Sequence, residues 1–154
     1  MLFIQYEFEL GKHFLYCNIK IKTAKCMGVD IFKNLLIVGL GSFFGGGARY
    51  LISVAMSNIG KAFPWGTLTV NLVGCFVVGL LCGIFSRTAN DGGALALFCT
   101  FGVCGGFTTF STFSKEAFLM LQAGNYWAFA IYIAVSVIVG ILLTAAGYAL
   151  SRGI

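Results

Sequence analysis

A run of nine residues, GGFTTFSTF (105–113), combines residue types that could bind ions inside a membrane. It lies within an uncharged stretch from Gly92 to Ser114. A glycine pair followed by β-branched and hydroxylic residues disfavours helix. Non-helical backbone at bilayer depth persists only where protein or a water-filled cavity satisfies its polar groups. Carbonyl groups freed at such a break are ligands for a hard cation. The run therefore predicts a site, and with it a transport protein.

Two aromatic side chains in this run offer a different chemistry. Phe110 and Phe113 are three residues apart and flank Ser111 and Thr112. Such a pair is commonly part of a core, but the edges of aromatic rings carry partial positive charge. Rings turned edge-on, together with the Ser111 hydroxyl, could therefore cradle a small desolvated anion. The residues alone leave both interpretations open.

Neutral hydrogen-bond donors recur at helical spacing in two other segments. Thr67 and Asn71 are four residues apart and so share a helix face. The Asn71 amide is a double donor that is costly to bury in lipid without partners. Tyr132 and Ser136 form a second pair with the same spacing. Each pair predicts either a hydrogen bond between helices or a row of donors along an ion path.

Arg49 is the one charge that the sequence places firmly within a span, where charge commonly marks a transport site. It is either a structural residue that snorkels or an attraction for anions at an aqueous vestibule. The carboxylates of Asp30, Asp91 and Glu116 are expected at helix ends or in loops. Donors and a cation without a membrane carboxylate suit an anion better than a cation. The acid–base pairs of most hydrolases are missing too, so we do not expect an enzyme.

Four apolar helices must position these residues. The chain is 59% hydrophobic and only 10% charged, with a mean hydropathy of +0.95, whereas a soluble domain carries about 25% charge. Its 154 residues accommodate about four spans of about 20 residues each. No segment has the period of a strand, so the prediction is an all-α membrane protein. The expected spans are 34–56, interrupted at 45–47 and at Arg49, then 66–85, 93–122 with a break near Gly105, and 126–150.

Residues 1–26 differ from the rest, because they carry four lysines and two glutamates without a stretch long enough to span. Met27 offers a second start. We expect 1–26 to be a dispensable extension or a mis-assigned start, and 27–154 to be the membrane domain. His13 lies outside the spans and is expected to be incidental. The six cysteines form no CxxC pair, so packing is expected rather than redox or metal chemistry.

The positive charges that set membrane orientation are nearly balanced. So weak a bias permits insertion in both orientations followed by antiparallel pairing. Glycine pairs at four-residue spacing, Gly41 with Gly45 and Gly79 with Gly83, predict close helix contacts. From Met27 onward, one side carries Lys33, Arg87 and Arg152 and the other carries Lys61 and Lys115.

Three motifs in order resemble the bacterial fluoride channel family, Fluc or CrcB: GGGARY (45–50), GTLTVNLVGCFVVG (66–79) and GGFTTFSTFSKE (105–116). The resemblance covers about 27–152. It implies a multi-pass subunit of the cytoplasmic (inner) membrane, surrounded by lipid and assembled as a dual-topology antiparallel homodimer, or with a paralogous subunit. Such dimers carry two fluoride pathways and a central structural sodium ion. The implied activity is passive export of fluoride, which lowers its cytoplasmic concentration.

The resemblance also assigns roles to single residues. It puts the pathway asparagine at Asn71, with Thr67 beside it. Backbone carbonyls of Gly105 and Thr108 from both subunits would hold the sodium. One departure is Phe107, where an aliphatic residue is common, and it should be tolerated because its backbone matters more. The remaining pathway residues are the pore phenylalanines Phe110 and Phe113, the hydroxyl track Tyr132 and Ser136, and Arg49 of the first helix.

Two rival functions remain compatible with the residues. The first is a small-molecule exporter built from four antiparallel helices, which proton-coupled uptake of a cationic dye would support. The second is a non-transporting assembly protein whose glycine faces bind a partner helix. In that case the polar cluster has no role, and Phe110→Ile should be harmless.

Overall fold

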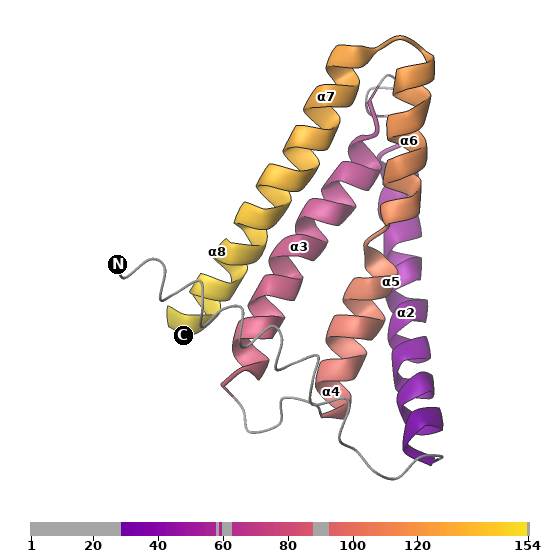
Figure 1. Ribbon diagram of the computed structural model, residues 1–154. Coiled ribbons are helices and arrows are strands. Elements are labelled where there is room, and N and C mark those ends of the chain that lie inside the picture. The colour runs from indigo at the N-terminus through magenta and orange to yellow at the C-terminus, as the bar shows by residue number, and fades with distance from the viewer. Residues whose placement is uncertain (1–28, 58, 60–62, 88–92, 154) are drawn as a thin grey trace.

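The computed structural model describes residues 29–57, 59, 63–87 and 93–153, and the regular elements within them are all helices (Figure 1). The predicted all-α fold with four spans is confirmed, whereas the proposed extension 1–26 lies outside the described residues. The first two spans are α2 (Val29–Ala55) and α3 (Trp65–Phe85). The third joins α4 (Ala94–Ala96), the π-helical η2 (Leu97–Cys104), α5 (Gly105–Phe107) and α6 (Phe110–Gln122). The fourth joins α7 (Tyr126–Ala134), the π-helical η3 (Val135–Val139) and α8 (Gly140–Gly153).

All four spans are long and apolar enough to cross a membrane, with mean hydropathies from 1.5 to 2.5 in their most apolar windows. No more than 28% of any such window is buried inside the chain. A soluble protein would hide so much apolar surface in a core. The chain is therefore a multi-pass membrane protein whose apolar side chains face lipid or another protein.

The first span was expected to be interrupted at Gly45–Gly47 and Arg49, and this prediction was wrong. Helix α2 continues unbroken through all of them, because helical backbone satisfies its own polar groups in lipid. The glycines here permit close packing instead. A Cβ atom on Gly45 would lie 2.1 Å from the Val103 carbonyl oxygen of the third span.

Helix α8 packs closely against α3, as α2 does against the third span (Figure 1). A Cβ atom on Gly79 would lie 2.1 Å from the carbonyl oxygen of Thr144. At the end of this pair, the Arg87 guanidinium donates hydrogen bonds to the carbonyls of Ser151 (3.0 Å) and Arg152 (2.8 Å). These are orphan acceptors at the α8 terminus, so Arg87 ties the two helices together.

The turn between α6 and α7 reverses the chain (Figure 1). Gly124 has a φ of +72°, and its N–H donates to the Leu121 carbonyl at 3.1 Å. The Asn125 N–H donates to the Met120 carbonyl at 3.0 Å. This is a Schellman motif, which uses glycine for its left-handed residue. It folds α7 back along α6 and brings Tyr132 beside the site.

The break predicted near Gly105 is confirmed, and it lies at the two threonines that follow. Gly105 remains helical, with φ −64° and ψ −38°. Gly106 serves packing, since a Cβ atom there would lie 2.7 Å from the Ser42 carbonyl oxygen. Thr108 and Thr109 are extended, with ψ values of 155° and 112°. The third span thus consists of two helical parts joined by an extended link, Thr108–Thr109.

Candidate functional site

Asn71 of α3 holds the extended link from the side. The Thr109 N–H donates to Asn71 Oδ1 at 2.9 Å, and Asn71 Nδ2 donates to the Thr109 carbonyl at 3.2 Å. One amide side chain therefore satisfies both polar groups of a non-helical residue, as burial requires. The Nδ2 group carries two hydrogens, so one donor remains after this pair is formed.

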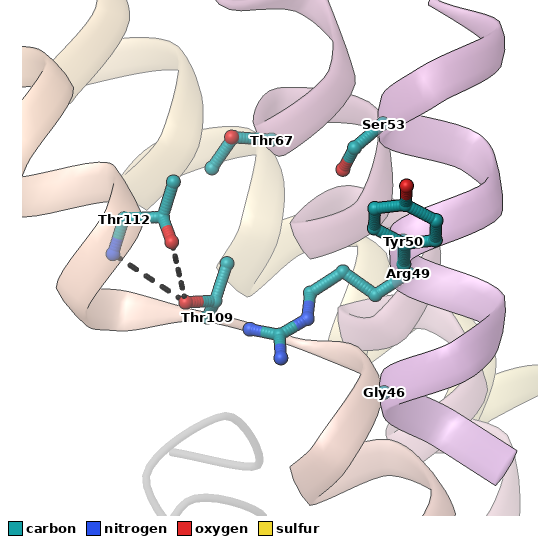
Figure 2. Close-up of a pocket in the computed structure, with 7 residues that line it drawn as sticks. All are labelled: Gly46, Arg49, Tyr50, Ser53, Thr67, Thr109 and Thr112. Atoms are coloured by element: carbon teal, nitrogen blue, oxygen red, sulfur yellow. Dashed lines mark hydrogen bonds between the residues drawn. The ribbon is translucent and has the colours of Figure 1, made fainter. Parts of the chain in front are cut away.

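The Thr109 side chain begins α6. Its hydroxyl oxygen accepts from the Thr112 N–H at 3.4 Å and donates to the Thr112 hydroxyl at 3.1 Å (Figure 2). Ser111 lies beside it, 3.4 Å between hydroxyl oxygens. Threonine is a strong helix N-cap, and the unpaired N–H groups of a helix start favour an anion. The predicted Ser111 thus lies at the positive end of α6, inside the bilayer span.

A cavity of about 280 Å³ opens beside this helix start. Figure 2 shows the Arg49 side chain extending from α2 toward Thr109, with Tyr50 and Ser53 on the same helix. Arg49 forms no hydrogen bond or ion pair with any residue that the structure describes. A half-buried cation without a partner is costly inside a span. The cavity is therefore electropositive and surrounded by hydroxyl groups, a combination that accommodates an anion. Its lining residues are Gly46, Arg49, Tyr50, Ser53, Thr67, Thr109 and Thr112.

The two phenylalanines predicted to line the pathway, Phe110 and Phe113, have contrasting surroundings. Their ring centroids are 5.8 Å apart and their planes are inclined by 43°. Phe113 is 9% exposed and packs in the core, whereas Phe110 is 79% exposed. The two rings lie side by side, as their three-residue spacing on one helix face predicted. Only Phe110 is left free on the surface of this chain, where a second subunit or lipid would cover it.

Glu116 corrects the prediction that no carboxylate lies within a span. It lies inside α6, half-buried, and its two oxygens accept hydrogen bonds from the hydroxyls of Thr67 and Tyr132, both at 2.8 Å. Sequence reasoning missed it because Glu116 lies near the end of an apolar stretch. Its position three residues after Phe113 was the available signal, since that spacing keeps it on the buried face of α6.

The hydrogen bonds to Glu116 occupy two hydroxyls that were predicted to donate to an ion. Thr67 is 7% exposed and Tyr132 is fully buried, and each hydroxyl has one hydrogen. In this structure both hydrogens are directed to Glu116. Either side chain must therefore exchange this bond before it can donate to an anion.

A second cavity, of about 270 Å³, lies against Glu116. It shares Ser53, Thr67 and Thr112 with the first cavity. The two cavities are therefore neighbours, with the Arg49 cation at one end and the Glu116 carboxylate at the other. The second cavity is also lined by Phe63 and Pro64 of the turn before α3, by Trp65 and Gly66 at the start of α3, and by Met56, Ser57 and Ile59.

Ser136 lies in the π-helical η3, away from both cavities. Its hydroxyl oxygen is buried and has no hydrogen-bond partner among the described residues. Buried polar atoms are rarely left unpaired, so this hydroxyl is available to a bound ion. Of the predicted pair, the Tyr132 hydroxyl is thus hydrogen-bonded and the Ser136 hydroxyl has no partner among the described residues.

The predicted cation ligands lie at the break. In an uninterrupted helix the Thr109 N–H would bond the Gly105 carbonyl, but here it bonds Asn71. The Gly105 carbonyl therefore lacks this helical partner. The described residues form no cluster of three His, Cys, Asp or Glu side chains that could hold a metal, so a cation at this point would need backbone oxygens.

Four apolar spans around a row of hydroxyls, an amide and an unpaired cation define a membrane channel rather than an enzyme. A family model for CrcB-like proteins (Camphor Resistance, CrcB) matches residues 36–148. The chain belongs to this family, as its three motifs predicted.

Curated relatives, matched over nearly their whole length, support this assignment. A fluoride-specific ion channel FluC of Methylobacterium nodulans is 42% identical over 119 residues, 77% of this chain and 96% of the relative. A protein of the same name from Phocaeicola vulgatus is 44% identical over 113 residues, 71% and 91% of the two chains. One from Agrobacterium fabrum is 43% identical over 122 residues, 79% and 98%.

Proposed function

We propose that this chain is the subunit of a channel that conducts fluoride passively. The observation that carries the proposal is the similarity to relatives named fluoride-specific ion channels, of which the chain covers 91% to 98%. The chemistry of the site supports it independently. Its donors are neutral amide and hydroxyl groups, its free charge is a cation, and its one carboxylate accepts two hydrogen bonds.

The Arg49 cavity is the entry. Its positive potential attracts the anion from water. The hydroxyls of Ser111 and Thr112 then replace some of the water molecules that hydrate the anion. The start of α6 adds its unpaired N–H groups there. Several weak donors in sequence suit conduction, because an ion must leave each position as easily as it arrives.

The narrow part of the path follows the phenylalanines. Ring edges of Phe110 and Phe113 face the anion with partial positive charge, and Asn71 contributes its second amide hydrogen. Beyond them, hydroxyls of Thr67, Tyr132 and Ser136 replace the lost hydration. Glu116 keeps the first two hydroxyls oriented and exchanges them with the passing ion.

A structural sodium ion fits the break between α5 and α6. Backbone carbonyls of Gly105 and Thr108 from two subunits would hold it, and the carbonyl that Asn71 deprives of its helical partner supports this assignment. The ion would supply fixed positive charge near the midplane of the bilayer.

The functional unit is an antiparallel homodimer with two pathways. Phe110 of α6 and Phe43 and Phe44 of α2 are exposed aromatic residues that a second subunit would cover, which supports this assembly. Hydrogen fluoride enters cells as a neutral acid and ionises inside. A passive channel then lets the negative interior potential drive the anion out, so no energy source is required.

Fluoride efflux from liposomes that hold the purified protein tests the proposal. A fluoride electrode should record rapid release only when a potassium ionophore dissipates the charge, and chloride release should stay at the level of protein-free liposomes. No fluoride release from folded, dimeric protein would overturn the proposal.

A further inference from the structure

Five aromatic rings form a continuous row from the turn before α3 to the break of the third span. Consecutive ring centroids are 4.8, 5.4, 5.0 and 5.8 Å apart. One end of the row is thus a phenylalanine of the proposed pathway. The other end lies at the start of α3, beside a connecting turn to which no role has been assigned so far. In order, the rings belong to Trp65, Phe63, Tyr132, Phe113 and Phe110.

The backbone of the turn holds Phe63 in a defined position. The Trp65 N–H donates to the Phe63 carbonyl at 2.9 Å, across Pro64 with φ −81° and ψ 65°. This is an inverse γ-turn, and the proline ring restricts φ to nearly this value. Pro64 then accepts the first helical bond, from Leu68 at 3.1 Å. Phe63 is therefore held both by a rigid turn and by the start of α3.

The Phe63 ring contacts Tyr132, one of the residues taken as part of the ion path. It meets the Tyr132 ring edge to face, with planes inclined by 80°, and Phe113 packs on Tyr132 at 5.0 Å. Tyr132 is fully buried, and its hydroxyl donates to Glu116. The χ1 rotamer of a tyrosine sets the direction of its ring axis and therefore where its hydroxyl lies, so the two rings packed on Tyr132 help to keep this hydroxyl at Glu116.

Phe63 also forms part of the wall of the second cavity, beside Thr67 and Glu116. It packs against the same core cluster that contains Phe113 and Tyr132. Its ring thus lies both at the cavity that Glu116 lines and against the core that holds Tyr132.

We propose that Phe63 is a positioning residue for ion permeation. Its ring holds Tyr132 so that the Tyr132 hydroxyl lies at Glu116 between passing ions and is in place to exchange this bond with the next one. The proposal rests on the proposed function, because Tyr132 and Glu116 are taken as parts of the fluoride path.

A double-mutant cycle in the liposome efflux assay tests this role. Phe63→Leu should lower the initial fluoride rate by about three- to tenfold, the range for losing one aromatic contact. Phe63→Tyr keeps the ring and should retain the wild-type rate. Phe129→Leu is the matched control, because Phe129 packs against the same cluster but lies outside the cavity lining, and its rate should be unchanged.

The decisive variant combines Phe63→Leu with Tyr132→Phe. If Phe63 acts through the Tyr132 hydroxyl, its substitution should change the rate by less than about twofold once that hydroxyl is gone. If the double variant instead loses rate by the product of the two single fold-changes, the two residues act independently and the proposal is overturned. A Phe63→Leu rate equal to wild type would also overturn it. If Phe63→Leu does not fold, Phe63→Met takes its place in the cycle. A wild-type protein that releases no fluoride would overturn the proposed function instead.

Discussion

Asn71 bonds both backbone groups of Thr109, and with this one side chain it fixes the extended link of the third span. The same amide has a second hydrogen that can face an ion. At the scale of a residue, Asn71 is therefore both a scaffold for the break and a donor beside it.

Asn71→Asp should lower the initial fluoride rate at least about tenfold. A carboxylate cannot donate to the Thr109 carbonyl, leaves that acceptor unpaired at a cost of about 1–3 kcal/mol, and repels the anion. The electrode assay measures the rate. Asn125→Asp provides the control, since Asn125 is exposed in the α6–α7 turn and its side chain makes no cap hydrogen bond. Undiminished flux through Asn71→Asp would remove Asn71 from the pathway.

Single residues were predictable where spacing along one helix was enough. Thr67 and Asn71 share a face of α3, as their spacing predicted, and both form hydrogen bonds with the third span. Their partners, Glu116 and Thr109, are 49 and 38 residues further along the chain. No local pattern connects residues so far apart, because only the packing of two spans brings them together. This is why the role of Glu116 was missed.

At the scale of elements, close packing depends on glycines that face a neighbouring backbone. Gly79→Ala should destabilise the protein by about 1–3 kcal/mol, the usual cost of overpacking, because its Cβ atom would overlap the Thr144 carbonyl. A thermal unfolding curve in detergent should show a lower midpoint. Gly39→Ala is the control: nothing lies within 4 Å of its Cβ position, so its midpoint should not fall. An unchanged midpoint for Gly79→Ala would contradict the packing described for α3 and α8.

The four spans were predictable because hydropathy over about 20 residues is a strong signal. The break in the third span was predictable from its glycines and threonines, although Gly106 serves packing and it is the threonines that are extended. The π-helical segments η2 and η3 were not predicted. A π turn differs from an α turn by one residue of hydrogen-bond register, and the same apolar composition serves both. In α2 the error was the opposite one: a break was predicted at the glycine triplet, but this segment stays helical in lipid.

At the scale of the whole molecule, orientation in the membrane decides how two copies can pair. From Met27 onward, three basic residues lie on one side of the expected spans and two lie on the other, a difference too small to impose one orientation. The exposed Phe110 is consistent with a face that a second copy covers.

Labelling of introduced cysteines should therefore find both orientations. Asn125→Cys and Ala94→Cys, made with the native cysteines replaced by alanine, put exposed thiols at opposite ends of the third span and its turn. A membrane-impermeant maleimide applied to intact cells should label about half of the copies of each variant. Labelling after permeabilisation gives the total. Complete labelling of one variant and none of the other would mean a single orientation and exclude the antiparallel homodimer.

The bond between Thr109 and Asn71 also has a consequence for biogenesis. A newly inserted span surrounded by lipid must satisfy its backbone internally, so the Thr109 N–H of an undocked third span has only its own helix to bond. The extended link can form only when α3 supplies the Asn71 amide. The third span would therefore enter the bilayer as one continuous helix and open when it docks against α3, so that the proposed ion path is created by assembly rather than by insertion.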